Sequence, residues 1–389
     1  MAGRRGNNEG GISKRSDGRW MARITLDGGT RKALYGKTRA EVAKKMQEAL
    51  HDVGRGVPLV DERQTVKQYL TGWYETMRSQ IRPSSYRRYG DYVNHLVPGL
   101  GQHSLAKLSP QHLQAFYNRK LAEGLSATTV HAIHSMLHRA LDDALQMGLV
   151  SRNVSEMLKP PKRDHREMMP LSVIEVRRFL DVVADDRFYA LYVLALSTGM
   201  REGELLALRW QDVDLARRIA QVRMNVQETS GRYIVAETKT AYSRRTVALT
   251  QAAVDALTAH WQHQQRDKAT MGDQWDNTLD LVFPNGYGGI MIPHNITKRS
   301  FKRYLVKAGL SRETRFHDLR HTAATLLLAS GVNVKVVSEM LGHSNVSITL
   351  STYAHVLPHM QQSAVQAMDT LLGTPVESYE PEKIDRLLE

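Results

Sequence analysis

Two stretches rich in turn-forming residues divide this chain of 389 residues, one at 51–63 ("HDVGRGVPLVDER") and one at 158–170 ("LKPPKRDHREMMP"). Glycine and proline interrupt helices and strands, so we interpret both stretches as linkers. The chain is also too long for one ordinary hydrophobic core. We therefore expect three domains, at 1–55, 62–155 and 168–372, followed by a tail at 373–389.

The first segment carries more than half of the chain's excess positive charge. Residues 1–60 contain 13 lysines and arginines against 6 acidic residues, a net +7 of the protein's +13. Alternating side chains at 20–26 and turn signals on either side predict two or three short antiparallel strands. The capping box "TRAE" then predicts a helix that begins at Thr38, with Glu41 reaching back to the cap. A two-stranded ribbon fits the major groove of DNA, so we favour DNA binding over a solvated basic appendage. The candidate contacts are Arg19, Arg23, Arg31 and Lys32.

The second segment is helical throughout. The capping box "TVKQ" and the pair Ser109-Pro110 are typical helix starts, and the expected helices are 66–78, 83–95, 110–123 and 127–147. Basic and aromatic residues interleave in "SSYRRYGDY", where Arg87 and Arg88 are further candidate DNA contacts. A row of histidines follows on one helix face, which we interpret as polar surface and not as a metal site: His131, His134 and His138.

The third segment mixes helices with short strands. "SVIE" predicts a helix that starts at Ser172, with Glu175 completing the capping box. Helices are expected to about residue 208 and again to about 372, with strands between them near 219–226, 233–237 and 245–249. The expected fold class is a multidomain, mainly α chain with small β: a three-stranded sheet plus helix, an α-helical domain, and a mixed α+β domain.

The composition narrows the function. A net charge of +13 and a pI near 9.8 point to a polyanionic partner. The absence of cysteine excludes a disulfide framework and a Cys-based zinc site. The longest apolar run, 189–200, is too short to span a membrane, and the N-terminus lacks the apolar stretch of a secretory signal. We expect a cytoplasmic protein that binds nucleic acid.

Four places in the third segment set polar side chains among apolar ones. Each has an ordinary explanation alone: an Arg201–Glu204 ion pair, an exposed hairpin lysine, or a tyrosine that packs in a core. Together they place two arginines, a lysine, two histidines and a tyrosine in one basic domain: Arg201, Lys239, His317, Arg320, His343 and Tyr353. That set suits phosphoryl transfer without a metal ion, because cationic donors hold charge that magnesium would otherwise hold.

A zinc site is the rival interpretation of "HDLRH". His317 and His321 lie four residues apart, a spacing that can bind zinc on a helix, and Glu339 is a candidate third ligand. However, Asp318 stands where a metalloprotease has glutamate, and the fixed charge of Arg320 repels a metal. We therefore expect neither a metal nor another cofactor.

The six residues resemble the tyrosine recombinase (phage integrase) family in type, order and spacing. The matching phrases are "TGMREGELLALRW", "TKT…SRRTVAL", "HDLRHTAATLLLASG", "LGHS" and "TYAHV", which extend over residues 197–355. The helical segment looks like the core-binding domain of this family, and the first segment looks like the arm-binding domain of its integrase branch.

The resemblance implies roles for individual residues. Tyr353 would attack the scissile phosphodiester and form a 3′-phosphotyrosine, and His317 would accept its proton or position it. Lys239 would protonate the leaving 5′-oxygen. The phosphate would be held by two arginines and a histidine, one of the arginines being oriented by a glutamate: Arg201, Arg320, His343 and Glu204. His355 has no role beyond a surface position.

The resemblance also implies a function and partners. The chain would be a site-specific DNA recombinase that integrates or excises a mobile element, without ATP or metal. The partners would be double-stranded DNA and three further copies in a homotetramer, without a membrane. An excisionase and a host DNA-bending protein are further candidates, and the tail would dock on a neighbouring copy or stay solvated. The alternatives are a chromosome- or plasmid-dimer resolving recombinase, a zinc peptidase, or a DNA-binding regulator without catalysis.

Overall fold

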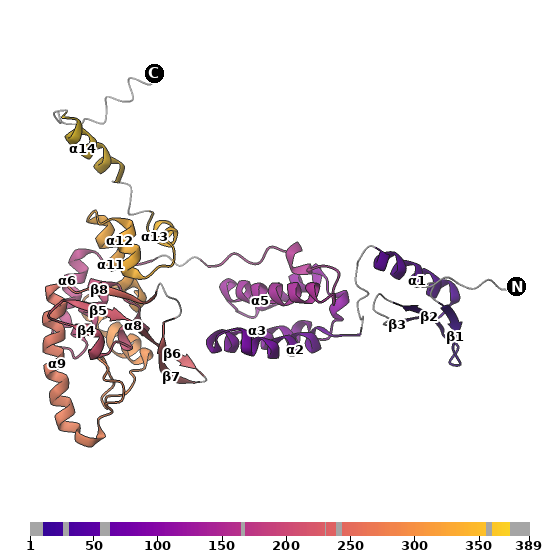
Figure 1. Ribbon diagram of the computed structural model, residues 1–389, viewed down its shortest axis with the longest axis horizontal. Coiled ribbons are helices and arrows are strands. Elements are labelled where there is room, and N and C mark those ends of the chain that lie inside the picture. Colours follow the sequence, from indigo (N-terminus) through magenta and orange to yellow (C-terminus); the bar gives the residue numbers. More distant parts are fainter. Residues whose placement is uncertain are drawn as a thin grey trace. The chain divides into compact units, whose positions relative to one another are not determined.

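The computed structural model describes residues 11–25, 31–54, 63–164, 168–229, 231–238, 243–354 and 360–373 (Figure 1). The chain separates into two compact units, Met1–Arg166 and Glu167–Glu389, which are treated one at a time. Within the described ranges, no helix has both the length and the apolar character needed to cross a bilayer.

The first unit begins with a small antiparallel sheet and a helix. The strand order is β1-β2-β3, and the elements are β1 (Gly11–Lys14), β2 (Trp20–Thr25), β3 (Arg31–Gly36) and α1 (Arg39–Gly54). Ala22 and Ile24 on β2 and Val42 on α1 are fully buried, so the helix covers one face of the sheet. The prediction of short antiparallel strands followed by a helix is confirmed.

The start of α1 agrees with the prediction, and its end differs from it. The side chain of Thr38 caps the backbone N–H of Glu41 (3.2 Å), and the Glu41 carboxylate interacts with the backbone N–H groups of Thr38 and of Lys37 (2.8 Å to the latter). The helix continues through His51 to Gly54, so the first linker begins later than expected.

The rest of the first unit is a helical bundle. Its elements are α2 (Val66–Gln80), α3 (Pro83–Leu100), the 3-10 helix η1 (Leu105–Lys107), α4 (Pro110–Ala122), α5 (Ala127–Gln146) and the 3-10 helix η2 (Val154–Met157). The capping box at Thr65 and the Ser109-Pro110 start are present as predicted. Helix α3 runs past Pro98, five residues beyond the predicted end, because Leu96 and Leu100 both pack into the bundle core.

The histidine row on α5 is a polar surface only in part, because one of its three members is buried. His134 is only 7% exposed and its Nδ1 contacts the hydroxyl of Tyr117 at 2.9 Å. Burial lowers the pKa of His134 to about 4. The other two also have protein partners, since Nδ1 of His131 contacts the carbonyl of Pro161 (3.1 Å) and Nδ1 of His138 contacts Asp142 (2.9 Å).

The second unit packs helices around short strands, as expected for a mixed α+β domain. Its helices are α6 (Val173–Val182), α7 (Tyr189–Thr198), α8 (Glu202–Leu206), α9 (Gln251–Met271), α10 (Lys302–Lys307), α11 (Phe316–Ala329), α12 (Val334–Leu341), α13 (Val346–Tyr353) and α14 (Met360–Leu372). Within the described residues, 3-10 turns at η3 (Trp210–Asp212) and η5 (Gly272–Gln274) and the π-helix η6 (Asn295–Phe301) lie between them. One sheet has the order β4-β5-β8 and a hairpin pairs β6 with β7: β4 (Val213–Asp214), β5 (Ile219–Val222), β6 (Met224–Thr229), β7 (Arg232–Glu237) and β8 (Arg245–Ala248).

Helix α7 is the centre of the second unit and packs against α9 and α11. Its side chains are almost all apolar and buried, and Tyr192 contributes to an aromatic cluster with Phe301 and Phe316. Because Phe316 is the first residue of α11, this cluster holds the start of the helix that bears His317. Helix α7 ends at Gly199 in the left-handed conformation (φ 61°), which a residue without a Cβ adopts readily.

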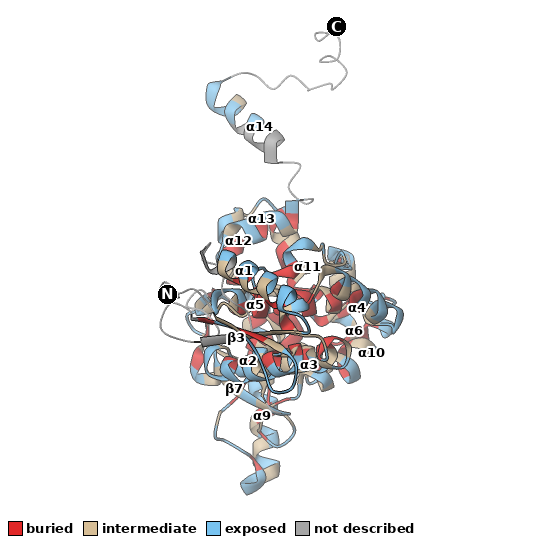
Figure 2. Cartoon of the chain, turned by 90° about the vertical axis from the view of Figure 1, so that its right-hand side faces the viewer, coloured by how far each residue is buried: buried red, intermediate tan, exposed pale blue. Residues whose placement is uncertain are grey.

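Helix α14 leaves apolar side chains in contact with solvent (Figure 2). Val365, Met368, Leu371 and Leu372 are each more than half exposed. The tail residues expected to dock on a neighbour, namely Ile384, Leu387 and Leu388, lie outside the described residues.

Candidate active site

Four elements of the second unit position the residues that the sequence singled out. Arg201 is the N-cap of α8, and His317 and Arg320 lie on α11. His343 follows the C-terminal Gly342 of α12, and Tyr353 is the last residue of α13. Helix α12 packs against both α11 and α13, which brings these residues together (Figure 1).

Arg201 is held by the carboxylate of Glu204. Its Nη1 donates to Oε1 (2.7 Å) and its backbone N–H donates to Oε2 (2.9 Å), while Nη2 approaches the carbonyl of Gly342 (3.4 Å). Glu204 is 2% exposed; burial alone would raise its pKa, but hydrogen bonds and charge from Arg245 and Arg201 lower the pKa below its ordinary value. The Glu204 carboxylate therefore stays ionised in the protein interior.

Arg320 is a buried cation whose donors are only partly used. It is 3% exposed, and Nη1 donates to the carbonyl of Gly199 at 2.7 Å. Among the described residues, Nη2 has no hydrogen-bond partner. Burial and the charge of Arg201 lower the pKa of Arg320 to about 9, which still leaves it charged at neutral pH. An unpaired buried guanidinium is costly, and an anion would relieve that cost.

Tyr353 is 1% exposed and its hydroxyl meets Nδ1 of His321 at 2.8 Å. Burial raises the pKa of the phenol to about 12, although the charge of Arg320 acts in the opposite direction. The expected partner was His317. In the structure the His317 ring instead packs edge-on against that of His321, with centroids 5.0 Å apart. His317 and His321 lie one turn apart on the same face of α11, so sequence spacing does not distinguish them. The sequence identifies His321 only as a candidate zinc ligand.

His317 lies at the surface of α11, where part of the residue is exposed and the surrounding protein partly desolvates the ring. Desolvation and the charges of His321 and Arg320 lower its pKa to about 4, so the ring is neutral at physiological pH. It lies beside the catalytic candidates without touching the phenol.

His343 is oriented by α13. Its Nδ1 contacts Oγ1 of the fully buried Thr349 at 2.8 Å, four residues before Tyr353. Desolvation, followed by the charges of Arg320 and Arg201, lowers the pKa of His343 to about 4. A neutral imidazole with Nδ1 on a hydroxyl has Nε2 available toward a ligand.

Sequence reasoning missed Arg245 on β8. Its side chain is 7% exposed and forms a two-pronged contact with Glu204, at 3.2 Å from Nη1 and 2.9 Å from Nη2. The neighbouring Arg244 is 57% exposed and approaches Glu237 at 3.7 Å. In "SRRTVAL" the strand alternation distinguishes the two arginines, and that alternation was the available signal.

In the part of the chain that it describes, the structure gives no contact that defines a role for the other residues singled out by the sequence. Lys239 and His355 lie outside the described residues, Lys239 in the connection between β7 and β8. Among the candidate DNA contacts the following side chains are exposed: Arg19, Arg23, Arg87 and Arg88. Arg31 and Lys32 belong to β3, and their side chains lie outside the described part.

The zinc interpretation loses its geometric basis. The carboxylate of Asp318 accepts from the backbone N–H of Arg315 (2.7 Å), so it caps α11 and is not available as a base. Glu339 is exposed and pairs with Lys335 at 3.1 Å. Within the described residues, the side chains close enough to share a metal ion belong to the first unit: His138, Asp142 and Glu156.

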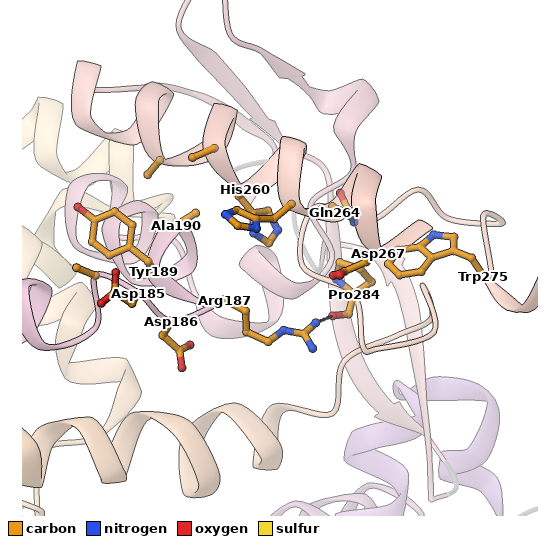
Figure 3. Close-up of a pocket in the computed structure, with 14 residues that line it drawn as sticks. Asp185, Asp186, Arg187, Tyr189, Ala190, His260, Gln264, Asp267, Trp275 and Pro284 are labelled. Carbon is orange, nitrogen blue, oxygen red and sulfur yellow. Dashed lines mark hydrogen bonds between the residues drawn. The ribbon is translucent and has the colours of Figure 1, made fainter. Parts of the chain in front are cut away.

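A hollow of about 510 Å³ lies elsewhere in the second unit, between residues 184–190 and α9 (Figure 3). Arg187, His260 and Asp267 line it, and none of the catalytic candidates that the structure describes does so. The hollow is therefore separate from the candidate active site.

Comparison with known proteins gives consistent matches. Residues 171–360 match the model for the phage integrase family, and residues 65–121 match the N-terminal SAM-like domain of phage integrase. A "Tyrosine recombinase XerC-like" protein of Caldanaerobacter subterraneus subsp. tengcongensis is 30% identical over 88% of this chain and 92% of its own length. An "Integrase" of Streptomyces ambofaciens is 30% identical over 95% of this chain and 98% of its own.

Solved structures share the fold. The Tn1549 transposon integrase in complex with a circular intermediate DNA aligns with a TM-score of 0.67 at 22% identity, over 78% of this chain and 99% of that one. A lambda integrase tetramer bound to a Holliday junction aligns with a TM-score of 0.55 at 20% identity, over 86% of this chain and 95% of that one.

Proposed function

From its membership of the phage integrase family, which makes this chain a site-specific DNA recombinase of the tyrosine type, we propose that it cuts DNA with Tyr353. The observation that carries this assignment is the contact between the Tyr353 hydroxyl and His321 (2.8 Å), beside the Arg320 guanidinium whose Nη2 lacks a partner in the described part. A nucleophile, a base and a cation for the phosphate thus lie together.

The first step requires a base. With a pKa of about 12, forming a free phenolate of Tyr353 at pH 7 would cost about 7 kcal/mol. Proton transfer in step with attack on phosphorus avoids that cost. We assign the proton to Nδ1 of His321, in place of His317, because His321 is the histidine within reach of the phenol. Desolvation lowers the pKa of His321, which keeps the ring neutral and able to accept.

The phosphate is held by cations and one neutral donor. Arg201 and Arg320 bind non-bridging oxygens, and the burial of Arg320 strengthens its effect on the developing charge. His343 donates from Nε2 in the tautomer in which Nδ1 accepts from the Thr349 hydroxyl. His317 contributes a further neutral ring nitrogen at the edge of the site, and Glu204 orients Arg201.

The second half of the step releases the leaving group. The bond from phosphorus to the 5′-oxygen breaks as the tyrosyl ester forms, and Lys239 supplies the proton to that oxygen. The 3′-phosphotyrosine retains the energy of the phosphodiester, so a 5′-hydroxyl from another strand reverses the attack and rejoins DNA. Neither ATP nor a metal ion is needed for this exchange, which integrates or excises a mobile element.

We further propose the assembly in which this chemistry occurs. The sheet-plus-helix at 11–54 binds arm-type DNA sites, and the helices within 65–154 grip the core site with the catalytic unit. Four copies act together, by analogy with the lambda integrase tetramer bound to a Holliday junction. An excisionase and a host DNA-bending protein are candidate accessory factors, and the reaction takes place in the cytoplasm.

The test is covalent capture. Wild type incubated with a nicked suicide substrate that carries its attachment site is expected to give a protein–DNA adduct. Tyr353→Phe should bind that DNA with unchanged affinity and give none, since only the hydroxyl is removed. An adduct in the Phe variant would overturn the assignment of Tyr353, and a wild type that binds but never forms adducts would identify a regulator without catalysis.

A further inference from the structure

Arg245 is the buried arginine of β8, and most of its N–H groups are already committed to the protein. Nε donates to the carbonyl of Met340 (2.6 Å), and Nη1 donates to Glu204 and to the carbonyl of Ser243, both at 3.2 Å. Nη2 donates to the other oxygen of Glu204 (2.9 Å). A guanidinium used in this way is a structural cross-link and has little left to offer a DNA phosphate.

These bonds join Glu204 on α8 to the C-terminal end of α12. The Glu204 carboxylate that Arg245 holds is the one that orients Arg201 at 2.7 Å, so one acid lies between two guanidinium groups. Met340 belongs to the last turn of α12, where carbonyls lack helical partners. Arg245 also packs on Gly342, where a Cβ would come within 3.0 Å of its Nη1. The next residue after Gly342 is His343.

We infer that Arg245 is a positioning residue for strand cleavage, which sets Arg201 through Glu204 and His343 through the end of α12. The inference rests on the proposed function. Arginine is required because its planar fork meets both carboxylate oxygens while Nε reaches a third acceptor, which a lysine ammonium cannot do from one position. One side chain therefore links two parts of the site, Glu204 on α8 and the C-terminal end of α12.

The test compares Arg245→Lys with its exposed neighbour, Arg244→Lys. Both changes keep the charge, and only the first breaks the fork. Single-turnover cleavage of the suicide DNA is expected to fall about 100-fold in Arg245→Lys, the loss that a displacement of about 1 Å in a site produces. Its Kd for DNA should stay at the wild-type value, and Arg244→Lys should cleave as wild type does.

A second measurement separates positioning from loss of folding. Arg245→Gln and Glu204→Gln, alone and combined, are compared in the same assay after thermal melts identify which variants are folded. If Arg245 acts in part through Glu204, the loss of cleavage in the double variant is smaller than the product of the two single losses, because both changes remove the same orientation of Arg201. Additive losses, or folded Arg245 variants that cleave as wild type does, would overturn the inference.

The wild-type control separates failure of the proposed function from failure of the positioning role of Arg245. Absence of wild-type adduct would refute the proposed function itself. A wild-type adduct, with Arg245→Lys losing cleavage and DNA binding in parallel, would refute only the positioning role and would make Arg245 a DNA contact.

Discussion

Two tyrosine–histidine pairs in this molecule share a geometry and differ in their surroundings. In the helical bundle the hydroxyl of Tyr117 meets Nδ1 of His134 at 2.9 Å, and in the second unit that of Tyr353 meets Nδ1 of His321 at 2.8 Å. Both tyrosines are essentially fully buried, and burial raises the pKa of both. Hydrogen-bond geometry therefore does not distinguish a packing pair from a reactive one.

The difference is the cation. Burial alone raises the pKa of Tyr117, whereas the charge of Arg320 opposes the rise at Tyr353. Arg320 is itself buried, with one nitrogen unpartnered in the described part of the chain. A buried tyrosine–histidine pair becomes a candidate for phosphoryl transfer where such a cation can bind a phosphate beside it.

The largest expected effect separates the two hydroxyl groups. Tyr353→Phe should abolish adduct formation, while Tyr117→Phe should form adducts at the wild-type level on the same suicide DNA. Tyr117→Phe leaves His134 without its partner, so it should lower the free energy of unfolding by about 1–3 kcal/mol in denaturant titrations. Adduct lost in both variants would mean that the comparison is wrong.

Arg320→Ala removes the cation that distinguishes the pairs. We expect its cleavage rate to fall about 1,000-fold in single-turnover assays, because the charge acts on the transition state. DNA affinity, measured by fluorescence anisotropy, should change little. Arg303→Ala, which removes an exposed arginine of the same unit (58% exposed), is the matched control. Cleavage and affinity lost together would instead assign Arg320 to general DNA binding.

His321→Gln tests the base, with His134→Gln as the equivalent change in the packing pair. Loss of a general base costs about 100-fold or more in rate, so we expect that loss in His321→Gln only. Because desolvation lowers the pKa of His321 below 6.5, wild-type cleavage should hold its rate at pH 6.5 and decline only at lower pH. A pH profile that keeps its histidine limb in His321→Gln and loses it in His317→Gln would return the role to His317.

The smallest expected effect is a loss of folding stability in acid, caused by His134 of the Tyr117–His134 pair. The folded chain binds a proton at His134 near pH 4, while the unfolded chain binds it near 6.5. The stabilisation is complete above pH 6.5 and is lost as pH falls toward 4, by at most about 3 kcal/mol. Hydrogen exchange of α5 amides between pH 7 and 4.5 should show this decline, and His134→Gln should flatten it. Equal slopes in the two proteins would remove His134 as the cause.

Local signals in the sequence predicted much of the fold. The caps at Thr65, Ser109 and Ser172 set three helix starts correctly, because a side chain that bonds the first turn acts over three residues. Helix ends were less accurate: α3 passes through Pro98 because distant packing of Leu100 outweighs the local penalty.

The sequence predicted which residues form the candidate site, but not which of them contact one another. Arg201 and Glu204 are three residues apart, so their pairing follows from one turn of helix. The contact between His321 and Tyr353 joins residues 32 apart, and that between Arg245 and Glu204 joins residues 41 apart. Both depend on how α11, α13 and β8 pack, which residue spacing does not encode. The burial of His134 was missed for the same reason.

The most direct test of the central claim is to locate the bond itself. Wild-type adduct on suicide DNA would be digested with nuclease and trypsin, and the peptides would be analysed by mass spectrometry. Nucleotide mass attached through phosphate to Tyr353, with the DNA joined by its 3′ end, is the predicted result. Nucleotide mass on any other residue, or a 5′ linkage, would contradict the mechanism proposed for this recombinase.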